Sequence, residues 1–93
     1  MSTPGRPRRA IRPREDLGRA VTVILRETRI ERGLTRAELA FRAQVSVQTL
    51  AKIEQGQSTD PGFTVVAAVA ETLALTLDDL IQRARNGATR PHA

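Results

Sequence analysis

The stretch from residue 34 to residue 56 constrains the fold of this chain most, because it contains two helix start signals followed by a stop signal. Its sequence is LTRAELAFRAQVSVQTLAKIEQG. Thr35 and Glu38 form a capping box, in which each side chain accepts a hydrogen bond from the backbone N–H of the other residue. Ser46 is a second N-cap residue, and Gly56 stands where a helix ends in the left-handed conformation. The stretch therefore predicts two short helices joined by a tight turn.

Apolar residues in this stretch recur at the spacing of one helix face. The inward positions are Leu39, Ala40 and Ala43 in the first helix, predicted over 36–43, and Leu50 and Ile53 in the second, predicted over 47–55. Two such helices, with the first bracing the second, are typical of a helix-turn-helix, whose second helix enters the major groove of DNA.

The pattern L-T-x-x-E-L-A-x-x-A-x-V-S-x-x-T-L-x-x-I-E-x-G resembles the signature of the lambda-repressor-like (Cro/C1-type, XRE) DNA-binding family. The similarity extends from about Leu17 to Ile81. It implies an all-α domain of five helices, with the helix-turn-helix as the second and third. It also implies sequence-specific binding to double-stranded DNA and transcriptional regulation, and we expect a repressor.

The chain is predicted to have three parts. Residues 1–14 combine arginines with three prolines and a glycine, which predicts a flexible basic arm. This arm either contacts DNA or is a solubilising leader. Residues 15–82 form the helical domain. Residues 83–93 are expected to be a basic, disordered tail, because an Asn-Gly pair and a late proline occur there.

Three further helices are predicted around the central stretch. The first begins at Glu15 or Asp16 and ends before Gly33, the fourth begins at Phe63, and Thr76 caps the fifth. The residues expected to supply their core faces are Leu17, Val21, Ile24, Leu25, Thr28, Phe63, Val66, Val69, Ala70, Leu73, Leu77, Leu80 and Ile81.

Charge is unevenly distributed along the chain. The net charge is +5, with 15 basic and 10 acidic residues. The basic excess lies at both ends, whereas residues 57–82 contain acidic residues and no basic ones. A more basic front, an acidic back and two basic ends suit a protein that docks on DNA by one face.

Composition disfavours several other classes of protein. There is no cysteine, and the single histidine, His92, lies next to the C-terminus, so neither a metal site, a cofactor nor an enzyme active site is expected. Phe41 and Phe63 are the only aromatic residues, which disfavours modules that stack on single-stranded bases. The longest apolar run, 63–70, is too short to span a membrane, and we expect a cytoplasmic protein.

The second helix of the motif carries the candidate DNA-contacting residues. Gln48 is the best candidate for reading a base, because its amide can pair with adenine through two hydrogen bonds. The alternative is an ordinary solvated helix face. The expected base-contacting residues are Val47, Gln48, Ala51 and Lys52, and the expected phosphate-contacting residues are Arg36, Thr49, Gln55, Gln57 and Ser58.

The resemblance also implies structural roles. It implies an ion pair between Arg29 and Glu54 that ties the first helix to the third. At four positions the sequence departs from the residue that the family usually has: Thr28 replaces leucine, Arg36 replaces glutamine, and Gln44 and Ala74 each replace a helix-ending glycine.

The fourth helix predicts self-association, because residues 63–70 are apolar at every position except Thr64. The expected homodimer interface consists of Val65, Ala68 and Thr72, and the dimer would bind a palindromic operator. The alternative function is an antitoxin, which neutralises a partner toxin and represses its own operon. Another regulator is also a possible protein partner.

Overall fold

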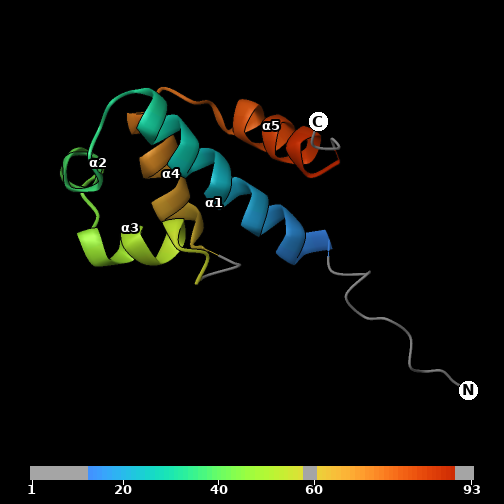
Figure 1. Ribbon diagram of the computed structural model, residues 1–93, viewed down its shortest axis with the longest axis horizontal. Helices are drawn as coiled ribbons and strands as arrows, with labels where there is room; N and C mark the ends of the chain where they lie inside the picture. Colours follow the sequence, from blue (N-terminus) through green and yellow to red (C-terminus); the bar gives the residue numbers. More distant parts are fainter. Residues whose placement is uncertain (1–12, 58–60, 90–93) are drawn as a thin grey trace, which may run out of the picture.

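The computed structural model describes residues 13–57 and 61–89, and these residues form five helices without any strand (Figure 1). This confirms the predicted five-helix, all-α architecture. The helices are α1 (Pro13–Glu31), α2 (Arg36–Ala43), α3 (Val47–Glu54), α4 (Phe63–Thr72) and α5 (Leu77–Thr89).

The helices enclose one apolar core. α1 packs most extensively against α5, while α2 packs against both α3 and α4. Figure 1 shows α2 and α3 at one end of the molecule, with the N-terminal half of α1 directed away from them. Every helix, or the residue that ends it, places one leucine in the core with at most 1% of its surface exposed: Leu25, Leu39, Leu50, Leu73 and Leu80. Burying a leucine side chain stabilises a fold by about 1.5–3 kcal/mol, so the motif is fixed to the domain.

The predicted caps of α2 and α3 are confirmed. The Thr35 hydroxyl accepts from the Glu38 N–H at 3.0 Å, and the Glu38 carboxylate accepts from the Thr35 N–H at 2.8 Å. The Ser46 hydroxyl accepts from the Thr49 N–H at 2.9 Å. These bonds satisfy N–H groups that the helices themselves leave without partners, and they fix the residue at which each helix begins.

A hydrogen bond that links the end of α1 to the end of α4 was not predicted from the sequence. The Arg32 guanidinium donates from Nε to the Leu73 carbonyl oxygen at 2.8 Å. Leu73 ends α4, where the helix dipole favours a cation. Arg32 therefore stabilises the C-terminal end of α4 from a turn that lies far away in the sequence.

The predicted boundaries at the two ends were partly wrong. α1 begins at Pro13, two or three residues before the expected start at Glu15 or Asp16, and α5 continues to Thr89. Residues 83–89 are thus helical rather than part of a tail. Ala84 is fully buried, and this packing offsets the cost of Gly87 within a helix. Residues 1–12 and 90–93 lie outside the described part of the chain.

Three apolar side chains that were expected in the core are exposed. Phe63 is 69% exposed, Leu77 39% and Ile81 36%. The core is closed instead by Thr22, Leu75 and Ala84, which are at most 7% exposed. Phe63 is the first residue of α4, and burial along this helix is deepest near its other end, where Val69 and Ala70 are fully covered.

Candidate nucleic-acid interface

One face of α3 is buried and the opposite face is open to solvent. Leu50 and Ile53 are at most 3% exposed, whereas Val47 is 46% exposed. Gln48 and Lys52 are also exposed, and Ala51 is half-buried. The structure thus places the four candidate base-contacting residues away from the core, on a short helix whose orientation is fixed by buried leucine and isoleucine.

The start of α3 is held by a local hydrogen-bond pair. The Ser46 hydroxyl accepts from the Thr49 N–H and donates to the Thr49 hydroxyl at 2.8 Å. Thr49 is half-buried, and its hydroxyl hydrogen remains able to donate, because a hydroxyl both accepts and donates. A phosphate oxygen is a suitable acceptor for that hydrogen.

Arg29 and Glu54 join the end of α1 to the end of α3. Arg29 donates from Nε to Glu54 Oε2 at 2.8 Å and from Nη2 to Glu54 Oε1 at 3.0 Å. The Arg29 side chain is 11% exposed and the Glu54 side chain is fully buried. Because breaking a buried pair leaves an uncompensated charge, the loss of one partner costs about 3–5 kcal/mol.

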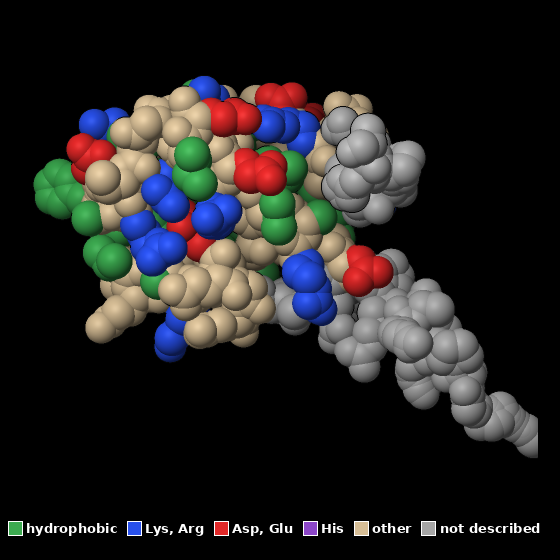
Figure 2. All heavy atoms as spheres, in the orientation of Figure 1, with side chains coloured by type: hydrophobic (Ala, Val, Ile, Leu, Met, Phe, Trp, Pro, Cys, Tyr) green, Lys and Arg blue, Asp and Glu red, His purple; other side chains and the backbone are tan. Residues whose placement is uncertain are grey.

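Arg36 is a second partner of the same carboxylate, which the sequence did not indicate. Its Nε lies 3.1 Å from Glu54 Oε1, and its side chain is 34% exposed. No sequence pattern links the two residues, because they belong to different helices and meet only when α2 and α3 pack together. Figure 2 shows Lys and Arg side chains gathered over the region where α1, α2 and α3 meet.

The remaining candidate phosphate contacts follow α3. Gln55 and Gln57 are exposed, and Gln57 Nε2 donates to Gln55 Oε1 at 3.2 Å. Gly56 between them has a φ of 74°, a conformation that residues with a side chain rarely adopt. Ser58 lies outside the described residues, as do residues 1–12 of the predicted N-terminal arm.

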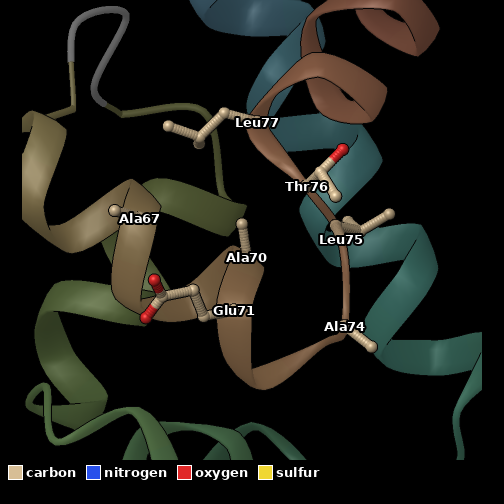
Figure 3. Close-up of a pocket in the computed structure, with 7 residues that line it drawn as sticks. All are labelled: Ala67, Ala70, Glu71, Ala74, Leu75, Thr76 and Leu77. Atoms are coloured by element: carbon tan, nitrogen blue, oxygen red, sulfur yellow. The ribbon is translucent and has the colours of Figure 1, made fainter.

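The candidate dimer residues on α4 are half-buried. Val65 and Ala68 pack against the core, and the Thr72 hydroxyl donates to the Ala68 carbonyl oxygen at 2.8 Å. A hollow of about 440 Å³ lies between α4 and the start of α5, and none of these three residues lines it. Figure 3 shows its lining residues: Ala67, Ala70, Glu71, Ala74, Leu75, Thr76 and Leu77.

The described residues contain no group of three or more potential metal ligands. None of the helices formed by these residues is long and apolar enough to cross a membrane.

Comparisons with known proteins identify the family. The helix-turn-helix family model matches residues 25–80, which run from α1 to the first turn of α5. The HTH-type transcriptional regulator DdrOP3 of Deinococcus deserti is 40% identical over 58 residues, covering 62% of this chain. The match spans 44% of that relative's length. This chain therefore belongs to the helix-turn-helix family and is of its lambda-repressor-like, Cro/C1 type.

Proposed function

We propose that this chain binds a specific sequence of double-stranded DNA through α3 and regulates transcription as a repressor. The observation that carries the proposal is the exposed face of α3, where Val47, Gln48 and Lys52 stand opposite two buried residues. A helix of this size fits the major groove, where each base pair presents its own pattern of donors and acceptors. The family and the name of the relative support this function.

The chemistry of the exposed side chains assigns their roles in the proposed complex. Gln48 would bind adenine through its amide, and Lys52 would donate to guanine or to a phosphate. Val47 and Ala51 would contact thymine methyl groups. The proposed phosphate contacts are Arg36, Thr49, Gln55, Gln57 and Ser58. Phosphate contacts fix the register of a protein on DNA without reading its sequence.

The proposal includes a homodimer on a palindromic operator, with α4 at the interface. Val65, Ala68 and Thr72 are each partly exposed on α4, and this remaining surface is available to a second copy of the chain. Glu71, Asp78 and Asp79 carry exposed carboxylates on α4 and α5, and in such a dimer these would repel their symmetry mates. We therefore expect a weak dimer that tightens on DNA.

A second candidate function is binding of a protein partner, such as a toxin or another regulator. Exposed aromatic side chains favour it, because Phe41 is 85% exposed and Phe63 69% exposed. Neither residue belongs to the outward face of α3, so a partner could cover them without occupying the proposed base-contacting surface. Copurification of the chain with the product of an adjacent gene would support this candidate.

Selection of binding sites from random duplex DNA tests the main proposal. We expect an enriched motif with two-fold symmetry and half-sites about 34 Å apart, one turn of DNA. No enrichment above the starting pool would refute sequence-specific binding. Equal affinity for the full site and a single half-site, with a monomer in sedimentation at high concentration, would refute the dimer alone.

A further inference from the structure

Two arginines converge on one buried carboxylate. The Glu54 side chain is fully buried, and both Arg29 and Arg36 donate to it. In the described part of the chain no other carboxylate forms an ion pair with either arginine. Two positive charges and one negative charge leave this cluster with one positive charge, next to the exposed face of α3.

The two arginines use their donors differently. Arg29 donates from Nε and Nη2 to Glu54 and from Nη1 to the Leu34 carbonyl oxygen at 2.8 Å. All three of its nitrogens thus have partners within the protein. Three of its five N–H groups are therefore used within the protein, and its side chain is 11% exposed. The role of Arg29 in the cluster is to hold Glu54 in place.

Most N–H groups of Arg36 have no partner among the described residues. A guanidinium has five N–H groups, and the only Arg36 N–H with a partner among the described residues is that of Nε. Four N–H groups on its two terminal nitrogens remain, and the side chain is one third exposed. Because Nε is fixed on Glu54, the terminal nitrogens form the edge that can hold two oxygens of one ligand.

The position of Arg36 in its helix adds to the positive electrostatic potential at this site. Arg36 is the first residue of α2, the end at which the helix dipole is positive. A cation is disfavoured there, although the Glu38 carboxylate already accepts a hydrogen bond from the Thr35 N–H at this helix end. The remaining positive charge of the cluster favours a second anion. A tetrahedral oxyanion with one or two negative charges fits these donors.

We infer that Arg29, Glu54 and Arg36 form a preformed site for one phosphate group, in which Glu54 is a positioning residue for Arg36. The inference rests on the proposed function insofar as the phosphate belongs to a DNA backbone. It goes further in giving Glu54, whose side chain is fully buried, an effect on DNA affinity separate from its effect on stability. Free inorganic phosphate shares the ligand chemistry.

Replacing Arg36 with lysine distinguishes the effect of its positive charge from the effect of the fixed orientation of its guanidinium. Arg36→Lys keeps the charge but has only one nitrogen, which cannot hold Glu54 and two phosphate oxygens in the same geometry. We expect affinity for a random duplex to fall about tenfold, with an unchanged dependence on salt. Arg42→Lys, on the exposed end of the same helix, is the matched control and should change neither. Wild-type affinity for Arg36→Lys would overturn the positioning role.

A double-mutant cycle tests Glu54 itself. Glu54→Gln should weaken duplex binding when Arg36 is present and add no further loss in an Arg36→Gln background. Circular dichroism and urea titration give the folded fraction on which each affinity is calculated. Equal losses in both backgrounds would show that Glu54 acts only through stability. If Glu54→Gln does not fold, the Arg36→Lys comparison decides the question.

Inorganic phosphate distinguishes this inference from the proposed function. Adding phosphate at constant ionic strength, with chloride as the reference, should raise the melting temperature of the wild type more than that of Arg36→Gln. If phosphate raises the melting temperature more in the wild type than in Arg36→Gln, but the wild type binds no duplex, the phosphate site is supported and the DNA-binding function is refuted. If the wild type binds its operator, phosphate shifts both melting temperatures equally, and Arg36→Lys binds duplex with wild-type affinity, the phosphate site is refuted and the DNA-binding function is not.

Discussion

Gln44 and Ala74 share the same left-handed backbone conformation, with φ angles of 60° and 61°, at the ends of α2 and α4. The following residue closes each turn in the same way. The Val45 N–H donates to the Ala40 carbonyl oxygen at 3.0 Å, and the Leu75 N–H donates to the Ala70 carbonyl oxygen at 2.8 Å. Both positions usually hold glycine in the family, and a residue with a side chain costs about 1 kcal/mol there.

We predict that Ala74→Gly stabilises the protein by about 0.5–1 kcal/mol, because the left-handed conformation costs glycine nothing. Ala74 is exposed, so little packing is lost, and urea titration measures the change. Gly33→Ala is the reverse control. Gly33 has a φ of 72° and no atom within 4 Å of an added Cβ, so its loss of about 1 kcal/mol would come from backbone strain alone. A less stable Ala74→Gly variant would contradict the prediction.

Thr28 provides a second test of stability. Its side chain is fully buried, and its hydroxyl is the one buried side-chain polar atom without a partner among the described residues. A methyl group in its place removes a desolvated, unpaired hydroxyl, so Thr28→Val should stabilise the fold by about 1–2 kcal/mol.

Thr22 is the matched control for Thr28. It is equally buried on the same helix, but its hydroxyl donates to the Arg19 carbonyl oxygen at 2.7 Å. Thr22→Val removes a satisfied hydrogen bond and is expected to lower stability by about 1 kcal/mol. Changes of the same sign in both variants would show that valine shape, rather than hydroxyl pairing, decides the result.

The sequence predicted the centre of the fold better than its ends. The caps at Thr35 and Ser46 act within three residues, so local chemistry alone specifies where α2 and α3 begin. α5 instead continues past Ala84, which is fully buried against the core, and such packing is a tertiary effect that local sequence does not show. An Asn-Gly pair predicts a turn only when packing does not oppose it.

The candidate site shows the same division. Helical periodicity predicted which α3 residues face outward, because Leu50 and Ile53 determine the buried side. Periodicity could not predict that Arg36 reaches Glu54, since this contact requires the packed arrangement of α2 and α3. It also could not predict the exposure of Phe63, because hydrophobicity indicates a preference for burial and not whether a neighbour is available.

Acid should weaken the start of α2. The N–H of Thr35 is the main cause that lowers the pKa of Glu38 below its ordinary value of 4.5, followed by the Thr35 hydroxyl and then the charge of Arg42. A lowered pKa means that the ionised carboxylate stabilises the fold above the pKa of the unfolded chain. This stabilisation is lost as the pH falls through the folded pKa.

Glu38→Gln removes this dependence on pH while retaining an oxygen that can accept from Thr35. Between about pH 6 and about pH 3 the wild type should therefore lose more stability than the variant. Urea titrations of both proteins across this range measure the difference. Parallel loss of stability in the two proteins would show that Glu38 does not contribute to acid unfolding.

Removal of residues 1–12 tests the proposed arm. This segment contains four arginines, namely Arg6, Arg8, Arg9 and Arg12. If all four neutralise phosphates, the log–log slope of affinity against salt should become shallower by about 3–4. The deletion ends before α1 begins, so the helical domain should keep its melting temperature. An unchanged slope would identify the segment as a leader that does not touch DNA.

Gln48 tests whether α3 reads a base. Gln48→Ala should weaken binding to the selected operator by about 1–3 kcal/mol and relax the preference at one base pair, because the lost amide can pair only with a particular base edge. Gln48 is exposed, so the fold should be unaffected.

Gln57→Ala removes the same amide from a proposed phosphate contact and is the matched control. It should lower affinity for the operator and for random duplex equally. Repeating the random-sequence selection with each variant measures both effects, and an equal loss on the two kinds of DNA for Gln48→Ala would exclude Gln48 from base recognition.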